Sequence, residues 1–279
     1  MMKVYSICSK RISFNSPRLP SDWEEWQEFE CKEGKPDIEI TAFIEDDIPS
    51  VPANSVTTAK GVQAGVLDGK VYRHTPMGTV KGALSIYDPA VPYKSECFFT
   101  KESFNVMTDI RYFWSSIALS QLLLYNNALF FHASYVEYEG KGIIFSAPCG
   151  TGKSTQAELW RRHKGATVIN GDKAGVLVEN GRATVYGVPF SGTSGICINK
   201  SMPLRAVVFL AQSKENTLVR LTGAQAVGEI LNNVYLDFAA PEEMQRCVDV
   251  AIELLKSVPV YRLSCTPDER AVEVLYEVL

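Results

Sequence analysis

One glycine-rich segment narrows the possible folds of this chain more than any other part of its sequence. It reads Ala147-Pro148-Cys149-Gly150-Thr151-Gly152-Lys153-Ser154 and follows the pattern G-x-x-x-x-G-K-[ST], with alanine in place of the first glycine. An apolar run at residues 143–146 precedes it, and an amphipathic stretch at residues 154–163 follows it. A buried strand, a glycine loop and a helix in this order predict an α/β fold with a phosphate-binding loop.

The residue types of this segment suit a nucleoside triphosphate. Gly150 and Gly152 allow backbone angles that turn successive N–H groups toward an anion. Lys153 is expected to reach the β- and γ-phosphates, and the hydroxyl of Ser154 to ligate Mg²⁺. An ordinary glycine-rich turn with an exposed lysine is the alternative. The predicted nucleotide site consists of Ala147, Pro148, Cys149, Gly150, Thr151, Gly152, Lys153, Ser154 and Thr155.

A second candidate site follows the β-branched run at residues 167–169, which ends in Asn170-Gly171-Asp172. In a P-loop fold, a carboxylate at the end of a neighbouring strand is a suitable ligand for Mg²⁺. Asp172 is therefore predicted to hold the metal, to accept a proton from an incoming hydroxyl, or both. The alternative is that Asp172 is only the polar corner of a turn.

A third candidate is His132, at the start of a predicted strand over residues 130–138. A turn at residues 139–142 would pair this strand with the one before the glycine loop and so bring His132 near the phosphates. A histidine within an apolar strand is more often a packing residue, so that alternative stays open. Residues 185–195 contain three glycines and suit either a loop that closes over a substrate or a plain surface loop.

The chain divides into two regions of different pattern. Residues 1–109 carry short apolar or alternating runs broken by turn residues such as Asp68-Gly69, which predicts a mostly antiparallel β region. Residues 110–127 have apolar spacings of three and four, typical of one helix at the junction. The predicted fold class is α/β, with a catalytic P-loop domain at residues 110–279.

Composition and charge exclude several classes of protein. The net charge of −4 and the pI near 5.6 argue against nucleic acid or an anionic membrane as the main partner. No apolar run is long enough to span a membrane, and residues 1–11 lack the apolar core of a signal peptide. The seven cysteines form no C-x-x-C pair. We therefore expect a cytoplasmic protein with no membrane partner and no cysteine-bound metal.

Residues 129–180 resemble the catalytic domain of the HPr kinase/phosphorylase family. His132 precedes the loop at the family's spacing, and Asp172 falls at the second of its paired acidic residues. The likeness is greater to the HPr-kinase-like proteins found beside peptide-modification systems. Their loop reads Gly-Thr-Gly-Lys-Ser-Thr-Gln, as residues 150–156 do here, and they share the segment Gly-x-Pro-Phe/Trp-Ser-Gly-Thr found at residues 187–193.

The resemblance implies an HPr kinase-like, carboxykinase-like P-loop domain that transfers the γ-phosphoryl group of ATP, or GTP, with Mg²⁺. The acceptor would be a serine or similar hydroxyl of a protein, peptide or small molecule, with Lys153, Asp172 and His132 as catalytic residues. Relatives are often multimeric, so a homo-oligomer is one expectation. Two departures are that Gly171 replaces the first acid of the pair and that the family's Arg-Gly-Leu-Gly signature is not visible near residues 187–195.

Two other functions stay open at this point. Nucleotide-dependent carboxykinases share the P-loop architecture, so phosphoryl transfer to an oxo-acid is one alternative. It would need an additional metal shell of His, Lys and Asp, and the chain has only three histidines. The other alternative is a nucleotide-binding regulator without turnover, which the missing first acid at Gly171 allows.

Overall fold

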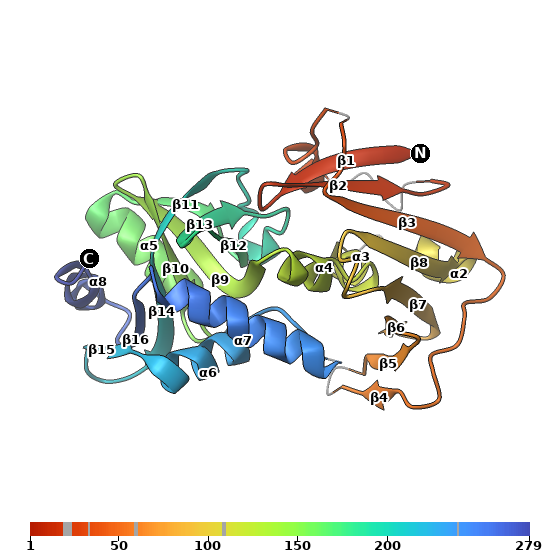
Figure 1. Ribbon diagram of the computed structural model, residues 1–279. Coiled ribbons are helices and arrows are strands. Elements are labelled where there is room, and N and C mark those ends of the chain that lie inside the picture. Colours follow the sequence, from red (N-terminus) through yellow and green to blue (C-terminus); the bar gives the residue numbers. More distant parts are fainter. Residues whose placement is uncertain (19–23, 33, 59–60, 108–109, 239) are drawn as a thin grey trace. The chain divides into compact units, whose positions relative to one another are not determined.

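The computed structural model describes residues 1–18, 24–32, 34–58, 61–107, 110–238 and 240–279, with the side chains of Ile110 and Arg111 left out. The chain forms two compact units (Figure 1). The first unit comprises Met1–Asn126 and Leu236–Arg246, and the second comprises Asn127–Tyr235 and Cys247–Leu279. Each unit contains one large sheet, so the predicted mixed α/β class is confirmed.

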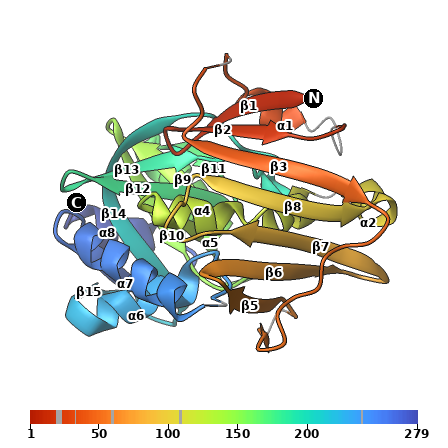
Figure 2. The same ribbon diagram turned by 45° about the vertical axis from the view of Figure 1, so that its right-hand side comes forward.

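The sheet of the first unit has the strand order β1-β2-β3-β8-β7-β6-β5-β4. Figure 2 shows this order from β1 to β5. The pairs β2–β3 and β3–β8 are parallel, and the other neighbours are antiparallel, as the short alternating runs predicted. Asp68 and Gly69, with φ of 50° and 78°, form the predicted tight turn between β5 and β6. The strands are β1 (Met2–Ile7), β2 (Lys10–Asn15), β3 (Ile38–Glu45), β4 (Val56–Thr57), β5 (Gln63–Leu67), β6 (Lys70–Met77), β7 (Val80–Tyr87) and β8 (Lys94–Thr100).

The single helix predicted at residues 110–127 is wrong, because the structure has two shorter helices there. Ala118 has a left-handed backbone, with φ of 50°, which interrupts the i to i−4 series of hydrogen bonds. The apolar spacing continues through both helices, so the pattern does not reveal the break. Residue 109, the predicted end of the first region, lies outside the described residues. The helices of the first unit are α1 (Glu24–Gln27), α2 (Lys101–Asn105), α3 (Ile110–Ser116) and α4 (Leu119–Tyr125).

A segment from late in the chain completes the first unit. Arg73, which is buried, donates to the carbonyl of Asp237 at 2.9 Å, and its guanidinium lies 3.7 Å from the Asp237 carboxylate. The hydroxyl of Tyr87 donates to the buried carboxylate of Glu243, and burial keeps the pKa of Tyr87 well above its usual value. These contacts place residues 236–246 with the first unit, which therefore does not coincide with the predicted region 1–109.

The second unit is organised around β9. Its first half, through His132, pairs with β12, and its second half pairs with β10. β11 pairs with residues 135–137 of β9, which also pair with β10. The sheet order is β10-β9-β12-β13-β14-β16-β15, and β10 also pairs with β14, in parallel. The strands are β9 (Ala128–Tyr138), β10 (Lys141–Ser146), β11 (Thr167–Asn170), β12 (Lys173–Glu179), β13 (Arg182–Gly187), β14 (Ser201–Gln212), β15 (Thr217–Leu221) and β16 (Val260–Cys265).

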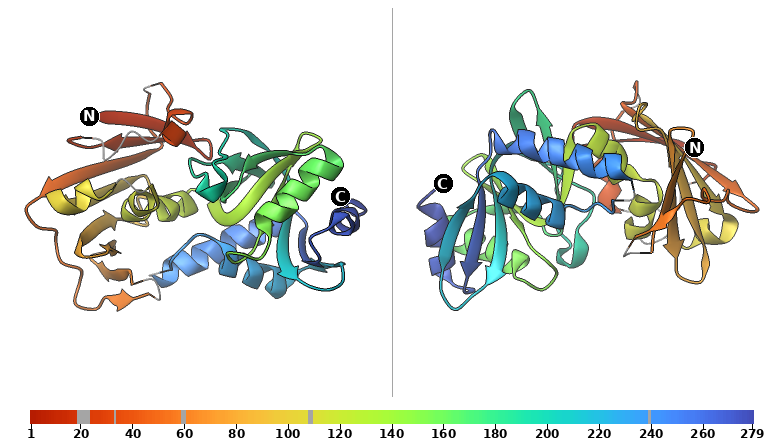
Figure 3. Two further views of the ribbon diagram at one scale, coloured as in Figure 1. Left: turned by 180° about the vertical axis from the view of Figure 1, so that it is seen from behind. Right: turned by 60° about the horizontal axis from the view of Figure 1, so that its bottom comes forward.

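Helices cover this sheet and bury an apolar core. Trp160 of α5 packs among buried side chains of β10 and β14, including Phe145 and Val208, and α5 lies beside α8 (Figure 3). None of the helices within the described ranges is long and apolar enough to cross a bilayer. The remaining helices are α5 (Lys153–Lys164), η1 (Gly192–Ser194), α6 (Gly223–Asn233), α7 (Pro241–Leu255), which begins in the first unit, and α8 (Glu269–Tyr276).

Candidate functional site

The glycine-rich segment forms a loop between β10 and α5, as predicted. Gly150 and Gly152 have φ of 78° and 120°, angles that residues with a side chain rarely adopt. A Cβ at either position would meet no atom within 4 Å, so the backbone angle and not a lack of space requires glycine there. Gly152 is the N-cap of α5 and provides no side-chain cap for the first turn of the helix. A helix start whose amides lack a side-chain cap is a natural place for an anion.

Lys153 is buried and fully engaged at the start of α5. Its ammonium donates to the carbonyls of Ala147 at 2.9 Å and Pro148 at 3.3 Å, and lies 2.9 Å from Nε2 of His132. An ammonium has three protons, so these three partners use its whole donor capacity. Burial lowers the pKa of Lys153, and the nearby Cys149 and Asp172 partly oppose that shift.

His132 links the loop to the end of the neighbouring strand. Its Nε2 accepts from Lys153, so Nδ1 carries the proton in the neutral ring and faces the carboxylate of Asp172 at 3.6 Å. Burial, followed by the charge of Lys153, lowers the pKa of His132 and favours the neutral ring. The ring is half-buried, as a packing residue would be, and it also contacts Lys153 and Asp172, as a site residue would.

In the turn after β11, Asn170 holds the backbone in shape and Asp172 presents its carboxylate to the site. The buried side chain of Asn170 accepts from the amides of Asp172 at 3.0 Å and Lys173 at 2.9 Å, which makes it the polar corner of the turn. The Asp172 carboxylate is left to face His132 and Lys173, and its backbone carbonyl accepts from Ala133 at 3.0 Å. Asp172 therefore lies with Lys153 and His132 at one place in the second unit.

Lys173 belongs to this cluster, although sequence reasoning missed it. Its ammonium lies 2.6 Å from Oδ2 of Asp172 and over the rings of Phe190 and Tyr235, at 4.3 and 4.5 Å from their centroids. It pairs directly opposite His132 across the β9–β12 ladder, which puts both side chains on one face. Lys173 could have been found only from the register between β9 and β12, which are far apart in sequence. Hydrophobic periodicity within one segment does not give that register.

The loop at residues 187–195 packs against the turn that carries Asp172. A Cβ on Gly171 would lie 2.0 Å from Oγ and 2.5 Å from Cβ of Ser194, and one on Gly192 would lie 2.6 Å from Cβ of Asp172. The side chain of Ser194 is held in place by a 2.6 Å hydrogen bond to the carbonyl of Ser191. The space of an acid at residue 171 is thus occupied by Ser194.

Ser154 and Asp172 are the residues predicted to provide oxygen ligands for a metal ion. Ser154 is exposed at the second position of α5, and Asp172 is partly exposed. Within the part of the chain that the structure describes, no three His, Cys, Asp or Glu side chains gather as a metal cage. Ser154 and Asp172 could hold a divalent cation together with ligand oxygens.

Comparison with known proteins places this chain in a family. The family described as SynChlorMet cassette protein ScmC matches residues 97–279, well over half of the chain. The chain belongs to the ScmC family. The match spans every site residue described above, from His132 to Tyr235. A search of curated protein sequences finds no match.

One solved structure is similar in part. The HPr(Ser) kinase/phosphatase from Coxiella burnetii aligns with 53% of this chain and 93% of its own, at 12% sequence identity and a TM-score of 0.32. A TM-score this low does not establish a shared fold.

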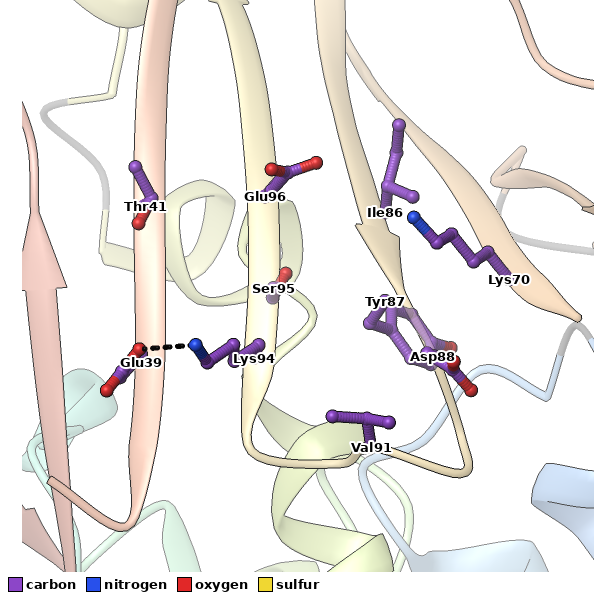
Figure 4. A pocket seen from close by; sticks show the side chains of 10 residues that line it. All are labelled: Glu39, Thr41, Lys70, Ile86, Tyr87, Asp88, Val91, Lys94, Ser95 and Glu96. Atoms are coloured by element: carbon purple, nitrogen blue, oxygen red, sulfur yellow. Dashed lines mark ion pairs between the residues drawn. The ribbon is translucent and has the colours of Figure 1, made fainter.

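A pocket of about 390 Å³ lies in the part of the chain that precedes the ScmC match (Figure 4). Acidic and basic side chains line it, and Glu39 and Lys94 form an ion pair across it at 3.4 Å. Its lining runs from Glu39 to Glu96 and shares no residue with the loop site.

The contact between Gly171 and Ser194 gives a first prediction. Gly171→Ala should destabilise the protein by about 1–3 kcal/mol, because the new methyl overlaps the Ser194 side chain. Ser194→Gly should recover most of this loss, since the next atom, the carbonyl oxygen of Ser191, is 3.7 Å away. Chemical denaturation of the two single variants and the double variant measures the coupling. Equal costs of Gly171→Ala with and without Ser194 would contradict the overlap.

The environment of His132 gives a second prediction, on pH. The pKa of His132 is lowered from 6.5 in the folded chain, so below about pH 6.5 the unfolded chain binds more protons than the folded one. The contribution of the neutral His132 ring to the free energy of unfolding is therefore present above that pH and is lost as the pH falls. The free energy of unfolding should decline less between about pH 7.5 and about pH 5 in His132→Gln than in the wild type. If the free energy of unfolding changed with pH in the same way in the wild type and in His132→Gln, a lowered pKa of His132 would be excluded.

Proposed function

We propose that this protein is a kinase that transfers the γ-phosphoryl group of ATP, or of GTP in its place, to a hydroxyl group of a protein, peptide or small molecule. The observation that carries the proposal is the meeting of Lys153, His132 and Asp172 beside the loop before α5. Phosphoryl transfer depends on positioning and on charge stabilisation, and these groups supply both. The sequence resemblance of residues 129–180 to HPr kinases supports the same chemistry.

The loop would hold the phosphates of the donor. The exposed loop residues Cys149 and Gly150 and the amides at the start of α5 provide the anion site. Lys153 would exchange its bonds to the carbonyls of Ala147 and Pro148 for bonds to the phosphates. Its lowered pKa does not prevent this, because a nearby phosphate favours the charged ammonium.

Ser154 and Asp172 fit a Mg²⁺ ion that arrives with the nucleotide. Magnesium in kinase sites is held by one or two protein oxygens, with phosphate oxygens and waters completing the shell. The exposed hydroxyl of Ser154 and the carboxylate of Asp172 are oxygens of this kind. When bound, the ion would neutralise charge on the transferred group.

Asp172 is the proposed general base. The acceptor oxygen bonds to the γ-phosphorus, the bond from phosphorus to the bridging oxygen breaks, and ADP leaves with that electron pair. The hydroxyl proton passes to the carboxylate of Asp172. His132 would orient this carboxylate through its Nδ1–H, because its Nε2 lone pair is directed at Lys153.

The contacts of Lys173 weigh against the carboxykinase alternative. A metal shell of His, Lys and Asp needs a neutral lysine nitrogen with a free lone pair. Lys173 is instead paired with Asp172 at 2.6 Å and lies over two aromatic rings, so its nitrogen is already engaged. Lys153 is likewise used as a donor to two carbonyls.

The role of Lys153 is tested by nucleotide binding. Lys153→Ala should weaken the binding of ATP with Mg²⁺ at least about tenfold, because charge-assisted hydrogen bonds to phosphate are lost. Calorimetry on the folded variant measures this. Lys141→Ala is the matched control, since Lys141 is exposed at the opposite end of β10. Equal affinity in the wild type and in Lys153→Ala would remove the nucleotide site from the loop.

The role of Asp172 is tested by transfer. Asp172→Asn keeps the shape of the side chain and removes its charge, so kcat should fall by about 10²–10⁴. The affinity for ATP should change much less. ADP release with a panel of alcohols and peptides measures the rate, and Asp68→Asn, in an exposed turn of the first unit, is the control. Nucleotide binding with no ADP release in the wild type would instead indicate a regulator.

A further inference from the structure

Lys173 is a buried cation that the proposed reaction does not use directly. It is 3% exposed, and its ammonium is enclosed by Asp172 on one side and by the rings of Phe190 and Tyr235. Burying a charge is costly, and an apolar side chain would pack between two rings without that cost. A lysine at this position therefore needs a reason beyond packing.

The surroundings of Lys173 hold it in one place. Tyr235 is fixed by a hydrogen bond from its amide to the carbonyl of Phe130 and by the adjacent bridge between Phe131 and Val234. Phe190 is buried. The ammonium between these rings lies 2.6 Å from Oδ2 of Asp172, which leaves Oδ1 as the oxygen that faces His132.

This arrangement assigns different partners to the two oxygens of Asp172. Oδ2 is paired with the ammonium of Lys173, and Oδ1 is the oxygen that faces His132. A divalent ion that used both oxygens would have to displace an ammonium held by two rings. The positive charge of Lys173 also lowers the attraction of the carboxylate for any free cation.

We propose that Lys173 is a positioning residue that serves as the fixed counter-charge of Asp172, so that the site accepts a divalent cation only together with a nucleotide. The lysine also holds the carboxylate of Asp172 beside Gly171, where the position of a second acid is closed by Ser194. This inference rests on the proposed kinase function for its consequence in turnover, while its consequence for cation binding does not require turnover.

Binding of Mn²⁺ without nucleotide is the direct test. Lys173→Met and Lys173→Gln both remove the charge; methionine fits an apolar slot, and glutamine keeps a donor beside the carboxylate. Each should bind Mn²⁺ at least about tenfold more tightly than the wild type, by calorimetry or electron paramagnetic resonance. Lys200→Met is the matched control, because it removes a charge from the same unit, at an exposed pair with Glu137.

Three further measurements make the test specific. In an Asp172→Asn background, Lys173→Met should no longer raise the affinity for Mn²⁺. Lys173→Arg should keep the weak affinity of the wild type. In turnover, Lys173→Met should lower kcat at least about tenfold and change the KM for ATP less than about threefold, because the lysine contacts Asp172 and not the phosphate loop.

The outcomes separate the two proposals. Unchanged Mn²⁺ affinity in both neutral variants, or an equal rise in Lys200→Met, would overturn the role of Lys173. A test without any variant at residue 173 compares the wild type with Asp172→Asn. Tight Mn²⁺ binding by the wild type without nucleotide, abolished in Asp172→Asn, would overturn the proposal even if no variant at residue 173 folds. Absence of ADP release in the wild type, with the expected Mn²⁺ results, would instead overturn the kinase function and leave the counter-charge in place.

Discussion

The pairing of β9 with three other strands brings the candidate site together. Because its two halves pair with β12 and β10, the loop after β10 and the turn before β12 meet near residues 132 and 133. The amide of Ala133 fixes the carbonyl of Asp172, and the side chain of His132 lies between the loop lysine and the turn carboxylate. A shift of one residue in this register would turn His132 to the other face of the sheet and separate these groups.

The placement of the candidate site residues could be predicted from the sequence because short segments determine it. The glycine loop needs two residues with positive φ between a strand and a helix, and Gly150 and Gly152 supply them. Asp172 follows directly on a β-branched strand. The position of His132 needed only one hairpin, whose turn residues Glu139 and Gly140 have φ of 51° and 71°. In each case the distance along the chain is short, so periodicity and turn residues determine the arrangement.

The remaining features depend on contacts between segments far apart in sequence. Lys173 joins the cluster through register with β9, and its ring partners Phe190 and Tyr235 come from other segments. Glycine at residue 171 is explained only by the position of Ser194. The break at Ala118 leaves the apolar spacing of the helix unchanged. The attachment of residues 236–246 to the first unit depends on buried polar pairs such as Tyr87 with Glu243, which no periodicity reveals.

The hydrogen bonds of Lys153 to its own chain bear on which ligands the proposed site would select. Its ammonium is already satisfied by two loop carbonyls and an imidazole, so an incoming ligand competes with the protein's own backbone for the same cation. If the loop binds phosphate as proposed, the affinity for the ligand would be the difference between two sets of bonds, and it would be reduced by the fraction of molecules whose lysine is still engaged internally. A ligand with a single phosphate offers little to displace those bonds, whereas a triphosphate offers several charged oxygens at once. Under the proposed function, these internal bonds of Lys153 would therefore favour a triphosphate over a ligand with a single phosphate.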